Sequence, residues 1–266
     1  MSFKSDELAK YIRLNSLKMC SRGKSSHIGS VLSCADMLAV LYSDVLNYYP
    51  DNPKSSTRDR FILSKGHAGA GLYAALVYCG FEPENILDTH YQNGSHLSGH
   101  VNHQLFSGIE ISTGSLGHGL PIATGIALSL QLQNSESKVF TLMSDGELDE
   151  GSNWEALLFA THHKLSNLRI LVDRNMIQSI TSTEKTLALE PLIDKFLSFG
   201  CQCSCIDGHN HDEILNTLAL NTGNKPHVLI CNTTKGKGVS FMENSVLWHY
   251  RSPDNKELEA AIQELS

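Results

Sequence analysis

Apolar and polar residues follow two alternating rhythms in the second half of the chain. Strand-like runs cover 138–143, 168–173, 201–207 and 227–233. Stretches with helical spacing lie before and between these runs. Strands that alternate with helices predict βαβ units, so we expect an α/β fold with a parallel β-sheet and helices on both faces, in three layers.

The first half of the chain has mainly helical patterning. Residues 8–19 show helical spacing, and the apolar segment after Ser33 repeats it, with Ser33 as the expected N-cap. A helix rich in small residues follows the short apolar run 61–63 and ends near Gly80. No internal repeat or linker interrupts the pattern, so we expect residues 1–266 to form a single domain.

Composition indicates an ordinary globular protein and excludes some functions. Hydrophobic residues make up 41% and charged residues 18% of the chain, which suits a packed core. The net charge of −7 includes no basic stripe, so we expect no nucleic-acid partner. The N-terminus lacks an apolar signal core and no apolar run approaches membrane-spanning length, so we expect a soluble, cytoplasmic protein without a membrane partner.

The seven cysteines include no C-x-x-C pair, which favours reduced thiols over a disulfide framework. Cys201, Cys203 and Cys205 alternate and would share one face of a strand. Buried structural cysteines are the favoured interpretation of this pattern, and a site for a soft metal is the alternative.

Polar loops follow three of the predicted strands, where an open parallel sheet binds its ligands. Asp145 and Gly146 follow one strand, Asn175 follows the next, and a lysine–glycine loop at 235–238 follows the last. A carboxylate, an amide oxygen and a backbone carbonyl suit a hard cation such as Mg²⁺ or Ca²⁺, and Gly146 lets a phosphate approach the backbone. The alternative is that Asp145 caps a helix and Asn175 fills a turn.

Two short motifs in these loops resemble those of thiamine-diphosphate enzymes. Such enzymes carry Gly-Asp-Gly and, further along, Asn-Asn, whereas this chain has Ser-Asp-Gly at 144–146 and Arg-Asn at 174–175. The resemblance implies thiamine diphosphate as cofactor, with Mg²⁺ or Ca²⁺ held by Asp145, Asn175 and the carbonyl of Ile177. The first residue of each motif departs from the family pattern, but neither occupies a ligand position.

Histidine-containing segments narrow the resemblance to the transketolase family. The matches keep the family's order and run from about residue 8 to residue 253, which makes them more specific than any single motif. Ile28, Ser115 and His118 are substitutions within them. The matching segments are Ser26–Gly29, Asp59–Ala68, Ser98–His100, Thr113–Gly119, Lys235–Gly238 and Trp248–His249.

The resemblance also implies roles for single residues. His27, His67, His100 and His249 are expected to line the channel for the thiazolium ring and the donor sugar, with Glu150 at the cofactor-binding interface. Imidazoles suit proton transfer near neutral pH. The expected cofactor-binding residues are His67, Gly114, Ser115, Leu116, Asp145, Gly146, Asn175 and His249.

The implied activity is that of a transketolase-type transferase, which moves a two-carbon ketol unit from a ketose (phosphate) to an aldose (phosphate). Full transketolases carry a second domain that grips the aminopyrimidine ring, and none is recognisable in residues 1–266. We therefore expect the partner to be a C-terminal transketolase subunit, in a heterotetramer with two copies of each chain. The small-residue helix at 119–130 is a candidate for that interface.

Several alternatives stay open. Within the same cofactor class they are a deoxyxylulose-phosphate synthase and a dihydroxyacetone synthase. A catalytically idle regulatory subunit has no chemical need for Asp145 and Asn175, and a nucleotide-binding dehydrogenase lacks its G-x-G-x-x-G here. A zinc site at His96, His100 and His103 is disfavoured because glycines nearby oppose a helix.

Overall fold

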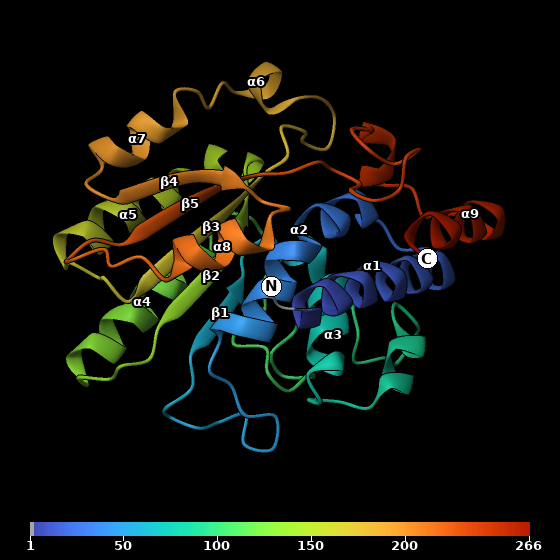
Figure 1. Ribbon diagram of the computed structural model, residues 1–266, viewed down its shortest axis with the longest axis horizontal. Coiled ribbons are helices and arrows are strands. Elements are labelled where there is room, and N and C mark those ends of the chain that lie inside the picture. Colours follow the sequence, from blue (N-terminus) through green and yellow to red (C-terminus); the bar gives the residue numbers. More distant parts are fainter. Residues whose placement is uncertain (1–2) are drawn as a thin grey trace.

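The computed structural model describes residues 3–266 and shows a parallel β-sheet between layers of helices (Figure 1). The sheet has the strand order β1-β2-β3-β5-β4, and every neighbouring pair is parallel. The expected fold class is therefore confirmed. The strands are β1 (Arg60–Leu63), β2 (Val139–Ser144), β3 (Leu168–Arg174), β4 (Gln202–Asp207) and β5 (His227–Asn232).

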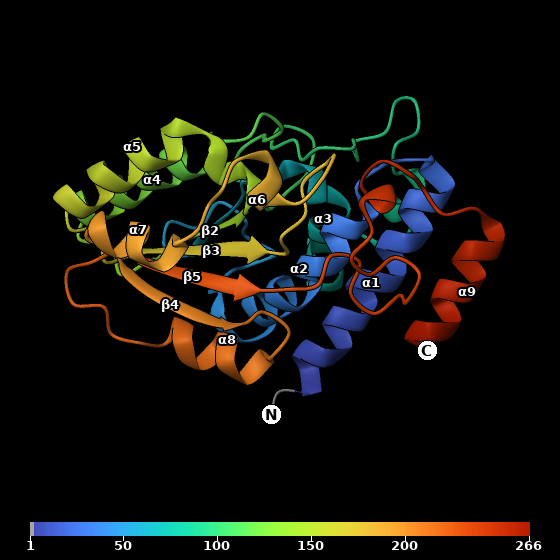
Figure 2. The ribbon, with the colours of Figure 1, turned by 90° about the horizontal axis from the view of Figure 1, so that it is seen from above.

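Helices cover both faces of the sheet. They are α1 (Phe3–Gly23), α2 (Ile28–Val40), α3 (Gly69–Tyr78), α4 (Gly119–Leu132), α5 (Gly151–His162), α6 (Thr183–Thr186), α7 (Leu192–Ser198), α8 (His211–Leu218) and α9 (Asn255–Leu265). One hydrophobic cluster joins the sheet to α1, α2, α3 and α8, and a second joins it to α4, α5 and α7. Figure 2 shows α4 and α5 on one side of the sheet and α8 on the other.

The two central strands place the polar loops beside each other. Every residue of β2 and β3 is buried, because helices cover both faces of the sheet. Their register pairs Ser144 with Asp173 at the carboxyl end. The loops that begin at Asp145 and Asn175 therefore leave the same edge of the sheet, as the order of strands along the chain predicts.

The helix α2 begins earlier than the sequence predicts. It starts at Ile28 and is buried throughout, so Ser33 lies inside the helix and is not its N-cap. The buried Ser33 hydroxyl instead donates to Asp173 Oδ2 (2.6 Å), which satisfies it away from water.

One apolar stretch also corrects an expectation from the sequence. The helical segment 28–45 is long and apolar enough to cross a membrane, although no run of that length was expected. Within the fold, 83% of the segment is buried. A helix surrounded by other elements needs no polar face, so here the apolar length reflects a core position.

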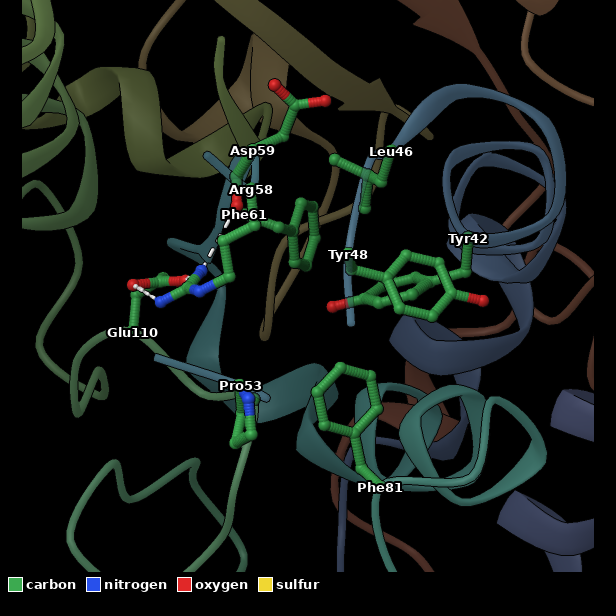
Figure 3. A pocket seen from close by; sticks show the side chains of 10 residues that line it. Tyr42, Leu46, Tyr48, Pro53, Arg58, Asp59, Phe61, Phe81 and Glu110 are labelled. Atoms are coloured by element: carbon green, nitrogen blue, oxygen red, sulfur yellow. Dashed lines mark hydrogen bonds and ion pairs between the residues drawn. The ribbon is translucent and has the colours of Figure 1, made fainter. Parts of the chain in front are cut away.

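A small aromatic cavity lies near the start of β1 (Figure 3). Tyr42 and Tyr48 have ring centroids 5.7 Å apart, and Phe81 lies 5.6 Å from Tyr48. An ion pair between Arg58 and Glu110 forms another wall. The cavity measures ≈ 20 Å³, room for about one water molecule, so it contributes to packing rather than to sugar binding.

The cysteines follow the expected pattern only in part. All seven are free, as the absence of a C-x-x-C pair predicts. Cys201 is buried, Cys203 is half-buried and Cys205 is exposed, so only the first of the three is the buried structural cysteine expected of them. Across residues 3–266, no group of three or more His, Cys, Asp or Glu side chains is placed to hold a metal.

Candidate functional site

A cavity of ≈ 250 Å³ opens at the carboxyl ends of the central strands. It gathers most of the residues that the sequence nominated from six separate segments. The nominated residues that line it are His27, His67, His100, Gly114, Leu116, Asp145, Gly146, Asn175, Ile177 and His249. Residues that were not nominated also line it: Ser30, Ser144, Gln178, Ser179, Lys235 and Tyr250.

One end of the cavity carries oxygen ligands. Asp145 is buried, and its carboxylate accepts the N–H groups of Gly146 (2.8 Å) and Met176 (2.7 Å). The Asn175 side-chain oxygen accepts the N–H of Ile177 (3.1 Å). These bonds fix the orientation of both side chains. Asp145 also caps the short 3₁₀ turn that follows it, so the capping alternative and the ligand role coexist at one carboxylate.

The donor set suits a hard cation. It combines a carboxylate (Asp145), an amide oxygen (Asn175) and a backbone carbonyl (Ile177), the ligand types that Mg²⁺ and Ca²⁺ take in proteins. Burial foremost, and then Asp173, raise the pKa of Asp145 to about 6. A cation at this carboxylate would offset that cost and favour the charged form. The residues present therefore fit a divalent metal.

Glycine is required where the two loops meet. A Cβ on Gly146 would lie 2.8 Å from Gln178 Cγ, so any larger residue would push apart the loops that carry the oxygen ligands. Glu147, the next residue, is completely buried and accepts hydrogen bonds from Ser64 Oγ and from the N–H of Gly117 (2.9 Å). This carboxylate ties the 113–119 loop to the end of β2.

The other end of the cavity holds a cluster of imidazoles. The ring centroid of His27 lies 4.9 Å from that of His249, 5.1 Å from His67 and 5.9 Å from His100. His27 immediately precedes α2 with a left-handed backbone (φ 75°), and its N–H donates to the His249 carbonyl (2.8 Å). The structure thus brings together the four histidines that the sequence nominated.

These imidazoles are neutral at physiological pH. Burial lowers the pKa of His27 to about 4 and that of His249 to about 3, with further lowering by neighbouring positive charges such as Lys235. Burial also places the pKa of His67 well below its ordinary value and lowers that of His100. Neutral imidazoles can both donate and accept a hydrogen bond, which suits proton transfer to a carbonyl or hydroxyl.

Lys235 is the main functional candidate that the nominated set omitted. Its buried ammonium lies 3.0 Å from His249 Nδ1 and donates to the Ile177 carbonyl (2.9 Å). Burial foremost, then Lys65, lowers the pKa of Lys235 to about 8. The lysine–glycine loop at 235–238 was a signal in the sequence, but nothing there shows which lysine turns inward.

A buried ion pair supports the floor of the cavity. Lys65, which follows β1, pairs with Asp173 of β3, and both side chains are completely buried. The same aspartate accepts from Thr233 Oγ1 (2.5 Å) and from Asn175 Nδ2 (3.2 Å). Because the Asn175 amide nitrogen is tied to Asp173, its oxygen is directed elsewhere.

Some nominated residues lie outside the cavity. Ser115 is exposed and does not line it. Glu150 is the N-cap of α5 and does not line it either, and Gly117 packs against its Cβ. The alternative zinc site is not formed: 96–103 is not helical, and His103 bonds to Ser112 Oγ (2.9 Å) away from the cavity.

Comparison with known proteins gives one consistent family. Residues 4–265 match the transketolase, thiamine diphosphate binding domain. One of the named subunits of the apulose-4-phosphate transketolase of Phocaeicola vulgatus is 40% identical over 92% of this chain and 88% of its own. The 6-deoxy-6-sulfo-D-fructose transketolase subunit SqwG of Clostridium sp. is 39% identical over 97% of this chain and 94% of its own.

A solved structure shows the same architecture. The transketolase of Campylobacter jejuni superposes with a TM-score of 0.94 at 31% identity. The match covers 100% of this chain but 43% of that chain, so this chain spans less than half the length of that transketolase.

Proposed function

The chain belongs to the transketolase family through its thiamine-diphosphate-binding domain, and we propose that it forms one half of a two-chain enzyme that transfers a two-carbon ketol unit from a ketose to an aldose. One observation carries the proposal. A single cavity joins hard-cation ligands at Asp145 and Asn175 to neutral imidazoles at His27, His67 and His249. A regulatory subunit would need neither set.

In this proposal the oxygen-rich end holds the cation and diphosphate. Asp145, Asn175 and the Ile177 carbonyl would hold Mg²⁺, and the backbone of Gly114 and Leu116 would contact the cofactor. Thiamine diphosphate, when bound, supplies the carbanion that the amino acids of this chain cannot provide. The chain's own residues bind, orient and exchange protons.

The histidines would act on the substrate's oxygens. The Lys235 ammonium donates to His249 Nδ1, so the neutral ring carries its own proton on Nε2 and can donate it. His27 Nδ1 lies 2.7 Å from Ser26 Oγ, which fixes the ring orientation. His67 completes the cluster. Rings held in this way would hydrogen-bond a carbonyl or hydroxyl and relay protons at neutral pH.

A complementary chain would supply the rest of the site. Two relatives of nearly the same length are named as transketolase subunits, which supports a split enzyme. We propose that the partner is a C-terminal transketolase subunit, with two copies of each chain. The exposed apolar side chains of Ile122 and Leu132 on α4, and of Leu158 and Phe159 on α5, would be covered in that assembly.

Substrate class and compartment are parts of the same proposal. The relatives are named for apulose-4-phosphate and 6-deoxy-6-sulfo-D-fructose, both sugars with an anionic group, and we propose an anionic ketose here. The free thiols suit a reducing compartment, and we place the enzyme in the cytoplasm.

Native mass spectrometry tests the proposal. The chain is measured alone and with its co-expressed complementary subunit, each with and without thiamine diphosphate and Mg²⁺. A cofactor-loaded assembly with two copies of each chain is the expected result. A chain that never retains the cofactor, with or without the subunit, would overturn the catalytic proposal.

A further inference from the structure

Arg174 is an unusual residue at the edge of the proposed site. It ends β3, where the motif of thiamine-diphosphate enzymes has asparagine, and its side chain is only 2% exposed. Nη1 donates to Thr183 Oγ1 (2.8 Å), and Nη2 pairs with Glu184 (2.7 Å) and Glu190 (2.8 Å). A third carboxylate, Asp145, lies farther away, at 3.5 Å from Nη1.

The two glutamates close a loop around this guanidinium. Glu184 also accepts the N–H groups of Leu189 (3.3 Å) and Glu190 (3.4 Å), and Glu190 accepts the N–H of Leu192 (2.8 Å). One buried side chain therefore holds 184–192 against the end of β3. Because a buried guanidinium needs all of its donors paired, each of these contacts offsets a desolvation cost.

The same loop carries a nominated cation ligand. The N–H of Thr183 donates to the Met176 carbonyl (3.0 Å), and Ile177 forms a β-bridge with Ser182. Residues 176–183 thus fold back on themselves and end at the residue that Arg174 contacts. Any loosening of Arg174 would reach the Ile177 carbonyl through this short hairpin.

The charges around Arg174 are unequally shared. The guanidinium is the foremost cause that holds the pKa of Glu184 below its usual range, and the Leu192 N–H and then Arg174 do so for Glu190. Both glutamates are therefore ionised at neutral pH. Two close anions compensate the one cation, so Asp145 makes only a long contact and keeps its charge for another partner.

We propose that Arg174 is a positioning residue for the cation and diphosphate site, and that Glu184 and Glu190 hold its charge away from Asp145. This inference rests on the proposed function, because the cation is the partner for which Asp145 is kept free. It predicts that neutralising the glutamates lets the guanidinium compete with the cation for Asp145, although neither glutamate touches the cavity.

Isosteric substitutions separate this electrostatic role from a structural one. In Glu184→Gln/Glu190→Gln, both side chains keep an oxygen that can accept the same hydrogen bonds, but two negative charges are lost. Mn²⁺ affinity should fall about tenfold, the equivalent of one pKa unit of electrostatic perturbation. Adding Arg174→Met removes the competing cation and should recover part of the affinity, which a purely structural defect would not do.

The readout is Mn²⁺ binding by electron paramagnetic resonance, in the presence of thiamine diphosphate and the complementary subunit. Glu136→Gln/Glu259→Gln serves as the matched control, because both residues are exposed, removed from this loop, and carry the same total charge. If the wild-type assembly binds no Mn²⁺, the proposed function fails. If it binds and the glutamate variant binds equally well, the inference alone fails.

Hydrogen–deuterium exchange tests the positioning role on the chain itself. Arg174→Met should speed exchange of the amides in 176–192 by about tenfold or more, while those of β4 stay unchanged. Unchanged protection of this loop in a folded Arg174→Met chain would overturn the positioning role. Global loss of protection is excluded by comparison with β4, so the loop-specific effect can be read directly.

Discussion

The buried ion pair between Lys65 and Asp173 offers a direct test of how the fold supports its cavity. Neither side chain is exposed, and the Lys65 ammonium also donates to the Ser30 carbonyl (2.9 Å). Substitution Lys65→Met keeps most of the side-chain length but removes the charge. Asp173 would then keep its hydroxyl donors, Ser33 and Thr233, without a compensating cation.

The magnitude follows from the burial. Breaking a completely buried pair by removing one partner costs about 3–5 kcal/mol, because the remaining charge is left in a medium that solvates it poorly. For a chain of this size, that corresponds to a Tm lower by about 10 °C. The double variant Lys65→Met/Asp173→Asn should regain at least half of the loss, because no unpaired charge remains.

The pH dependence gives a second signature. Burial alone raises the pKa of Asp173, but Lys65, Ser33 and Thr233 outweigh it and hold the pKa below its ordinary value. In the wild-type chain, this contribution is present above the unfolded pKa of about 3.9 and is lost as pH falls below it. In Lys65→Met, burial prevails and the pKa of Asp173 rises, so the variant's deficit grows as pH rises through that value.

Urea denaturation at pH 7 and pH 5, followed by circular dichroism, measures both effects. The deficit of Lys65→Met should be smaller at pH 5 than at pH 7. Equal unfolding midpoints for wild type and Lys65→Met at pH 7 would refute the reasoning, since they would mean that the pair adds nothing the isolated aspartate lacks.

Three further predictions follow from other buried groups. Asp145→Ala should abolish Mg²⁺-dependent binding of thiamine diphosphate by the assembled enzyme, because it removes the only anionic ligand of the proposed set; unchanged affinity by calorimetry would contradict the metal assignment. His67→Ala should lower kcat more than it weakens cofactor binding, and a defect confined to binding would place His67 with the cofactor instead. Asp36→Asn should cost about 3 kcal/mol in urea denaturation, because this buried carboxylate pairs with Arg13 (2.5 Å) and with His209 (2.7 Å), and an unchanged midpoint would contradict that pairing.

Local patterning explains how much of the fold could be predicted. The alternation of strands and helices predicts neighbouring parallel strands, and the register of β2 and β3 brings Asp145 and Asn175 to one edge as expected. Patterning failed at α2, where Ser33 looked like an N-cap. A helix buried on every side has no polar face to mark its start, so a polar residue inside it resembles a boundary.

Buried charges were beyond the reach of the sequence. Charged side chains are mostly exposed, so nothing local indicates that Lys65, Glu147 or Arg174 turns inward. Their partners are distant in the chain: Lys65 meets Asp173 across 108 positions, and Glu147 meets Ser64 across 83. Resemblance to a family places the histidines and oxygen ligands, but pairings of this length appear only once the sheet order is fixed.

These buried charges also connect the two ends of the cavity. Lys65 and Lys235 contribute, after burial, to the low pKa of His27 and His249. The same two lysines add positive charge where an anionic diphosphate would be placed, beside the Ile177 carbonyl that Lys235 contacts. An anion there would offset the lysine charges and raise the pKa of both imidazoles towards neutrality. The histidines would then become able to hold and release a proton only when the cofactor is in place, so proton transfer and cofactor binding are coupled through two lysines that need not touch the substrate.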